Sequence, residues 1–164
     1  MTAPKLEIPT DSLDHFLTGI AILCILLMLG LNLYYYELIP ERIPTHFNAT
    51  GKPDGYGGKI TLWILFGVSV LASGILYFTG RNPHLGNYTV PITEENAPRQ
   101  YQNMQRMNRT LTAVLCLCFA YIQYGIIQTA LGHQDGLGLW FLLLFLSLIF
   151  GIIAYFLYRA KVLE

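Results

Sequence analysis

Hydrophobic positions along this chain gather into four long runs that contain no Lys, Arg, Asp or Glu. Each run has about 20 residues, which at about 1.5 Å per residue matches a hydrocarbon core about 30 Å thick. A helix of a soluble bundle would need a polar stripe facing water, and none of the runs has one. The pattern therefore predicts four transmembrane helices, at about residues 16–36, 60–78, 111–131 and 137–158.

The stretches between the runs are too short to fold on their own. None exceeds about 35 residues, which is less than an independent hydrophobic core requires. We therefore predict a single membrane domain over residues 1–164, an all-α membrane protein with an ordered, turn-rich outer loop at residues 37–59. The connection at residues 132–136 is so short that the third and fourth helices must be antiparallel neighbours.

The distribution of basic residues indicates an orientation. Four spans place both termini on one side, together with residues 79–110. That side carries Lys5, Arg81, Arg99, Arg106, Arg109, Arg159 and Lys161, whereas the other side has Arg42, Lys52 and Lys59. Because cytoplasmic flanks of membrane spans collect Lys and Arg, we predict that both termini are cytoplasmic and that residues 37–59 are extracytoplasmic.

Composition argues against several classes of function. Ten basic and ten acidic residues cancel, so no overall field attracts nucleic acid. The three cysteines lie inside apolar runs, and Cys116 and Cys118 point about 200° apart around a helix, so they do not share a face for a metal ion. We interpret Cys24, Cys116 and Cys118 as packing residues, and we expect no metal and no other cofactor.

Polar residues of the third run mark a predicted contact inside the membrane. Polar side chains in lipid turn toward partner helices, so we expect this face to meet the first helix or the surface of Ser69 and Ser73. Gln123 points nearly opposite. Since the face has no ionisable group, contact between helices is favoured over a transport pathway. The predicted intramembrane polar face comprises Asn32, Tyr121, Tyr124 and Gln128.

Two further features of the spans predict contacts. Ser69 with Ser73, and Ser147 with Gly151, have the four-residue spacing of small residues that lets helix backbones approach closely. Residues from 98 onward favour helix with no Gly or Pro before the third run, so residues 79–110 should end in a helix that continues into the membrane. We expect Arg106 and Arg109 on that extension to anchor anionic lipid headgroups.

The loop at residues 37–59 is the most specific stretch of the chain. Proline fixes φ and glycine permits positive φ, so three prolines and four glycines predict defined turns rather than a flexible segment. The consecutive residues Pro53, Asp54 and Gly55 are the strongest turn signal. The positions with a predicted structural role are Pro40, Pro44, Gly51, Pro53 and Gly55.

Polar side chains around these turns are candidates for binding a peptide or a lipid headgroup. The same residue types also serve structure, because Asn48 and Asp54 commonly close turns through the backbone, and His46 can cap a carbonyl. Both roles stay open. A lone histidine lacks the further ligands of a zinc site, so we assign no metal ligand and no catalytic residue. The candidate ligand-binding residues are His46, Asn48, Asp54, Arg42 and Lys59.

The stretch LIPERIPTHFNATGKPDGYGGK, placed between two spans, resembles the bacterial membrane family called domain of unknown function 1648. The later stretch NYTVPITEENAPRQY is similar to sequence that follows the motif in such relatives. The family includes the Sdp immunity protein, which protects cells that make a secreted killing peptide. The resemblance implies a multi-span protein of the bacterial cytoplasmic (inner) membrane.

Together, loop and resemblance lead to a functional hypothesis. We expect a non-enzymatic protein with a binding, immunity or protection role through its outer loop. Its partners would be the lipid bilayer and a peptide or another membrane protein, and not nucleic acid. The alternative is a small membrane enzyme or permease subunit that acts with a partner.

Overall fold

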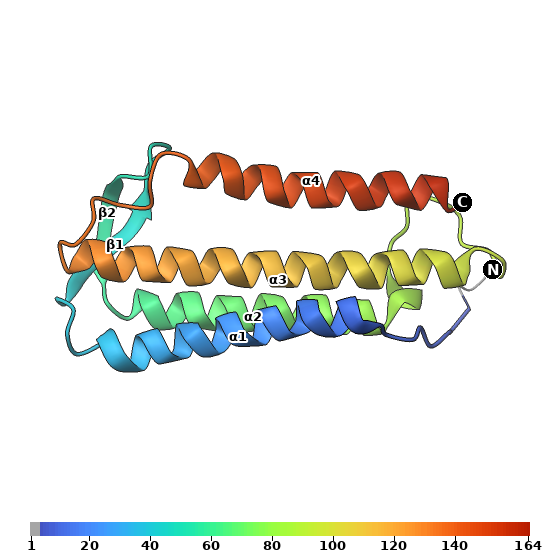
Figure 1. Ribbon diagram of the computed structural model, residues 1–164, viewed down its shortest axis with the longest axis horizontal. Helices are drawn as coiled ribbons and strands as arrows, with labels where there is room; N and C mark the ends of the chain where they lie inside the picture. The colour runs from blue at the N-terminus through green and yellow to red at the C-terminus, as the bar shows by residue number, and fades with distance from the viewer. Residues whose placement is uncertain (1–3) are drawn as a thin grey trace.

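The computed structural model, described here for residues 4–164, consists of four long helices and one small β-hairpin (Figure 1). The helices lie along a common direction, with the hairpin at one end of the bundle and both chain termini at the other. All four helices are long and apolar enough to cross a membrane, which confirms the predicted number of spans. They are α1 (Ser12–Tyr35), α2 (Thr61–Arg81), α3 (Ala97–Ala130) and α4 (Phe141–Val162).

The helix ends follow from local sequence. At the start of α1, the carboxylate of Asp11 accepts a hydrogen bond from the Asp14 amide at 3.0 Å, and Asp14 accepts one from the Asp11 amide at 3.1 Å. This reciprocal capping box satisfies two amides that the helix leaves free. Helix α3 has Pro98 in its first turn and is followed by Gly132 at φ 75°. Both are favoured positions, because proline needs no amide donor there and glycine tolerates positive φ.

Two connections between the helices have structure that the hydrophobic pattern did not predict, one after α2 and one before α4. One turn of 3₁₀ helix, η1 (Pro83–Leu85), follows α2. Helix α4 begins at Phe141, four residues after the start of its apolar run. The start of the run lies outside the helix, where Gly138 has a φ of 86° and the amide of Leu137 donates to the carbonyl oxygen of Gly51, 2.8 Å away.

Helix α3 is the centre of the bundle, and α1, α2 and α4 all pack against it. With 34 residues at about 1.5 Å each it is longer than the hydrocarbon core, so part of it extends beyond the apolar layer. One cluster of buried residues joins α1 to α3 through Cys24, Met28 and Cys116. All three cysteines are buried and free, as predicted for packing residues. The hydroxyl of Ser73 lies 3.0 Å from the Cys116 sulfur, which confirms that the Ser69 and Ser73 surface meets another helix.

The outer surface of the bundle is apolar. Leu23 of α1, Leu71 of α2 and Phe150 of α4 are 66%, 65% and 64% exposed. Water would penalise so much exposed apolar area, whereas lipid does not. The surface therefore supports lipid as the solvent of these helices.

The loop between α1 and α2 is a β-hairpin rather than a series of turns, so the all-α prediction is wrong for this segment. Strands β1 (Arg42–Phe47) and β2 (Pro53–Gly58) pair antiparallel. The chain reverses at Asn48, whose amide donates to the Lys52 carbonyl oxygen at 2.9 Å. Pro53, Asp54 and Gly55 therefore lie in a strand, because the reversal is completed before them.

Candidate functional site

The hairpin has a buried part and an exposed part. Ile43 of β1 is fully buried and packs with Leu62 of α2 and Ile126 of α3. Register shifts on either side of His46 interrupt the regular alternation of faces, and the side chains of His46, Asp54 and Tyr56 are exposed. Ile43 thus holds the hairpin on the helices, while these three polar side chains remain exposed.

A histidine and a carboxylate meet on the exposed part of the hairpin. The His46 Nδ1 atom lies 2.5 Å from Asp54 Oδ1, with side chains 73% and 44% exposed. His46 stands opposite Gly55, and a side chain at position 55 would place its Cβ only 2.9 Å from the Cβ of His46. Glycine at that position therefore makes room for the pair. An exposed pair of this kind contributes at most about 1 kcal/mol to folding, so stability alone gives little reason for it.

Asn48 has a structural role in the hairpin. Its side-chain oxygen accepts hydrogen bonds from the Thr50 amide at 3.0 Å, the Thr50 hydroxyl at 2.7 Å and the Lys52 amide at 3.1 Å. An Asn side chain that bonds to the backbone ahead of it closes a turn. Of the two roles left open for Asn48, the structure favours turn closure.

The two cations of the candidate set lie in different surroundings. Lys59 Nζ is 2.9 Å from Glu41 Oε1 and lies 4.8 Å from the ring centre of Tyr36. The hydrogen bond that the Lys59 ammonium donates to the Glu41 carboxylate raises the pKa of Lys59. Lys59 thus closes the base of the hairpin, whereas Arg42 is exposed and makes no ion pair within residues 4–164.

Glycines attach the tip of the hairpin to the connection between α3 and α4. Gly51 has φ 78°, and a Cβ there would overlap the backbone of Gly138. A Cβ at Gly136 would overlap the carbonyl oxygen of Gly51. Glycine is required at such positions because L side chains rarely adopt this φ and no space exists for one. Hairpin and connection therefore form one surface at this end of the bundle.

Inside the membrane, the predicted polar face is wrong in its composition. The fully buried Gln123 donates to the Met28 carbonyl oxygen at 2.6 Å and to Asn32 Oδ1 at 3.0 Å. Asn32 in turn donates to the Leu62 carbonyl oxygen at 3.3 Å. Helical periodicity places Gln123 opposite the predicted face, but it does not show which face of α3 turns to α1. That face carries Cys116, Ala120 and Ile127, whose small or apolar side chains pack against neighbouring elements.

The remaining members of the predicted face point elsewhere. Tyr121 and Tyr124 are both 46% exposed. The Tyr121 hydroxyl donates to the Leu137 carbonyl oxygen at 2.9 Å, and the Gln128 side chain lies 3.0 Å from His133 Nδ1. These groups therefore serve the connection between α3 and α4 and not a contact with Asn32 or with Ser69 and Ser73.

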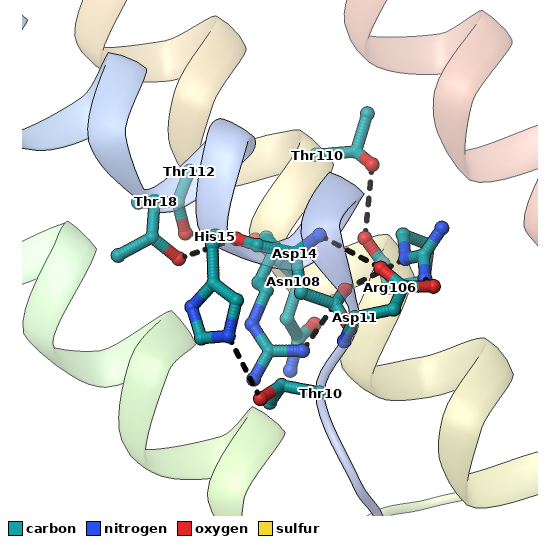
Figure 2. Close-up of polar contacts among 10 residues, drawn as sticks. Thr10, Asp11, Asp14, His15, Thr18, Arg106, Asn108, Thr110 and Thr112 are labelled. Carbon is teal, nitrogen blue, oxygen red and sulfur yellow. Dashed lines mark hydrogen bonds and ion pairs between the residues drawn. The ribbon is translucent and has the colours of Figure 1, made fainter.

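A cluster of ion pairs joins the start of α1 to α3 (Figure 2), and α1 starts at the end of the bundle opposite the hairpin (Figure 1). The Arg106 Nε atom is 2.7 Å from Asp14 Oδ1, and its Nη2 atom is 2.6 Å from Asp11 Oδ2. Arg109 Nη1 lies 3.0 Å from the same Asp14 oxygen. The Asp14 side chain is only 3% exposed. Arg106 and Arg109 are thus ion-pair partners of α1, which the predicted role in headgroup anchoring did not anticipate.

The electrostatics of Asp11 follow from this cluster. The Asp14 amide and then the Arg106 guanidinium donate to its carboxylate, and both hydrogen bonds lower the pKa of Asp11. A sequence signal existed, since two acids precede the first span and two arginines precede the third on the same predicted side. Within residues 4–164, no three His, Cys, Asp or Glu side chains form a group that could hold a metal ion.

Fold and site together define a class: a multi-pass membrane protein of four helices with a β-hairpin between the first two. Residues 23–70 match the family described as "Domain of unknown function (DUF1648)", which confirms the resemblance of the loop motif to this family. The match extends from within α1 through both strands of the hairpin into α2.

Similarity also extends beyond this segment. An "Uncharacterized protein" of Archaeoglobus fulgidus is 28% identical over 168 residues, which cover 94% of this chain and 91% of that protein. No solved structure matches the chain. The relative is archaeal, so proteins similar to this chain over nearly its whole length are found outside bacteria.

Proposed function

We propose that this protein is a non-enzymatic membrane receptor that binds a secreted peptide through its hairpin and thereby protects the cell. The observation that carries the proposal is the exposed part of the hairpin. Ile43 anchors the hairpin to α2 and α3, while His46, Asp54 and Tyr56 are exposed without a packing reason. The family match supports this location, because residues 23–70 include the whole hairpin.

The hairpin also offers a backbone edge. Within residues 4–164, β2 pairs with β1 alone, so no strand covers its second edge, and the Gly58 carbonyl oxygen already accepts from the Thr61 hydroxyl. Extended peptides bind such edges by adding a strand, and neighbouring side chains supply specificity. Gly55, Gly57 and Gly58 lack side chains that would keep a peptide backbone away. We therefore assign an extended peptide to the β2 edge, with Asp54 and Tyr56 beside it.

Orientation is part of this proposal. The excess of Lys and Arg at the end with the termini favours a cytoplasmic location for that end, and the hairpin lies at the opposite end (Figure 1). The hairpin would then face the extracytoplasmic side of a prokaryotic cytoplasmic membrane. A secreted peptide reaches that side without crossing the bilayer.

A survival assay tests the proposal. Cells that produce the protein are challenged with a panel of secreted, membrane-active bacterial peptides. We expect protection against at least one peptide, its loss in Asp54→Asn and His46→Gln, and unchanged amounts of both variants, because the pair is exposed. Lys52→Gln, also on the hairpin, is the matched control and keeps protection. Protection that survives in both pair variants would contradict the proposal.

The alternative, a small membrane enzyme, has one observation in its favour. A carboxylate 2.5 Å from a histidine ring nitrogen is the arrangement that orients histidine as a general base. The purified protein is incubated with membrane lipids and with the panel peptides, and products are followed by mass spectrometry. Turnover that His46→Gln abolishes would replace the binding proposal with the enzyme.

A further inference from the structure

Two cavities meet beside α4 at the end of the bundle that carries the termini. The first is polar, has a volume of about 250 Å³ and is lined by Arg99, Asn103 and Asp11 among others. The second has a volume of about 490 Å³, is mainly apolar, and lies along α4 at Ser147 and Gly151. Arg106 and Arg159 line both cavities, so the two cavities are adjacent.

The charges around the polar cavity do not cancel. Arg106 and Arg109 are balanced by Asp11 and Asp14. Arg99 and Arg159 line the cavity and make no ion pair within residues 4–164, which leaves a charge of +2. Arginine binds phosphate well because its planar guanidinium donates several hydrogen bonds. The cavity therefore suits an anionic ligand.

A second polar group at this cavity is incompletely bonded. Asn103 is 7% exposed and donates to the Phe156 carbonyl oxygen at 2.9 Å, but its side-chain oxygen is buried without a partner. A buried acceptor without a donor destabilises a fold. A ligand that carries a hydroxyl donor as well as a phosphate would complement Asn103 and the arginines together.

The apolar cavity explains the small residues of α4. We predicted that Ser147 and Gly151 mark a close helix contact, but no atom lies within 4 Å of a Cβ built at Gly151, and both residues line the cavity. Figure 1 shows α4 on the opposite side of α3 from α1 and α2, and the cavity lies between α4, Thr110 of α3 and Leu13 at the start of α1. In a bilayer such a groove is filled by a lipid chain, because an empty space would lose all packing contacts.

We propose that this groove binds one anionic phospholipid, phosphatidylglycerol. Arg99 and Arg159 hold its phosphate, a glycerol hydroxyl donates to Asn103, and one acyl chain lies along Ser147 and Gly151. The site is at the opposite end of the bundle from the hairpin (Figure 1). It is therefore independent of peptide binding by the hairpin.

Native mass spectrometry of the full chain tests the site. The protein is purified in detergent, depleted of lipid, and titrated with phosphatidylglycerol or phosphatidylethanolamine that carry identical acyl chains. We expect about tenfold tighter binding of phosphatidylglycerol, because both lipids carry a phosphate but only phosphatidylethanolamine adds an ammonium group, which the unpaired charges of Arg99 and Arg159 repel. Equal binding of the two lipids by the wild-type protein overturns the proposal.

Matched variants show which residues cause the preference for phosphatidylglycerol. The double variant Arg99→Gln/Arg159→Gln loses this preference. Arg81→Gln, at the same end of the bundle but on α2, retains it. Arg99→Lys/Arg159→Lys keeps the charge and part of the preference, which separates loss of binding from loss of folding. If the double glutamine variant is monodisperse and keeps the full preference, the proposed headgroup position is wrong.

The acyl groove has its own control pair. Gly151→Leu fills the groove and weakens the binding of both lipids. Gly30→Leu, at an equally open glycine of α1, leaves the binding of both lipids unchanged. Inorganic phosphate has the charge but no chain, so it does not displace the lipid at equal concentration. Equal weakening by the two glycine variants, or displacement by phosphate, overturns the proposed groove.

Discussion

The side-chain amide of Gln123 donates a hydrogen bond to Oδ1 of Asn32, 3.0 Å away, and both residues are fully buried between α3 and α1. Each amide also donates to a carbonyl oxygen of a neighbouring element, Gln123 to Met28 and Asn32 to Leu62. The pair thus joins three elements of the bundle in an apolar environment. If one of these hydrogen bonds is lost, water cannot replace the missing partner, as it could at a protein surface.

We expect Gln123→Leu and Asn32→Leu each to destabilise the protein in detergent, because each leaves buried polar groups unpaired, at about 1–3 kcal/mol. In a double-mutant cycle the coupling energy should be about 0.6 kcal/mol and below about 1.7 kcal/mol, the range measured inside membrane proteins. Reversible unfolding of the purified protein measures both quantities. Tyr124→Leu, at a half-exposed position, is the control, and a loss equal to that of Gln123→Leu would contradict the assignment.

Replacement of Asp14 should be severe. Its carboxylate is 3% exposed and pairs with both Arg106 and Arg109. Asp14→Asn leaves two largely buried guanidinium groups without their shared partner, and breaking such a pair costs about 3–5 kcal/mol. Thermal unfolding in detergent measures the loss. Asp11→Asn, at a 55% exposed side chain, should destabilise less, and the reverse order would refute this account.

Stability should fall at acid pH partly through Asp11. Hydrogen bonds to its carboxylate lower its pKa below the ordinary value of 3.8. A lowered pKa means that the carboxylate contributes stability above that ordinary value and loses it as pH falls through the folded-state pKa. Asn can still cap the helix but cannot ionise. The stability difference between wild type and Asp11→Asn, followed by denaturant unfolding, should therefore be constant near neutral pH and shrink below about pH 4. A difference independent of pH down to about 3 would exclude this linkage.

The hairpin tip should not tolerate a side chain. Gly51 has φ 78°, and a Cβ there overlaps the backbone of Gly138. Gly51→Ala should destabilise the hairpin by at least about 1–3 kcal/mol, the cost of a strained backbone position. Proteolysis after Lys52 in detergent should accelerate. Gly67→Ala in α2, where no neighbour lies within 4 Å, is the control and should be neutral or slightly stabilising, since Ala favours helix.

The proposed orientation predicts which cysteines react from outside. In a chain with Cys24, Cys116 and Cys118 replaced by Ala, Thr50→Cys lies at the hairpin tip and Gln102→Cys on the exposed surface of α3. A membrane-impermeant maleimide should label Thr50→Cys in intact cells and Gln102→Cys only after lysis. The opposite result would invert the orientation and remove the hairpin from the side reached by secreted peptides.

Sequence reasoning succeeded where the controlling property is local. Length and apolar content along the chain identified four candidate spans, and the loop motif identified the segment that matches a family. The same reasoning singled out His46 and Asp54, which the structure brings within 2.5 Å, although a binding role for them is our proposal. It wrongly assigned the reversal of the loop to Pro53, Asp54 and Gly55. A strong local turn signal does not reveal the register of the paired strands, so it could not show that these residues lie in a strand.

Two polar assignments failed for a different reason. Helical periodicity correctly placed Gln123 opposite Tyr124, but it could not show which face of α3 turns to α1. Arg106 and Arg109 appeared suited to lipid because their partners, Asp11 and Asp14, lie more than ninety residues earlier in the chain. Neither contact has a signature within one helix.

Sequence by itself determined lipid as the solvent of this protein. An uncharged apolar run of about 20 residues favours lipid over water in any arrangement of the helices. The tertiary structure alone decided which polar groups meet. Packing of Cys24 and Met28 against Cys116 and Ala120 sets the rotation of α3 about its axis. That rotation buries Gln123 beside Asn32 and exposes Tyr124, because close packing between helices permits one rotational setting and excludes the rest.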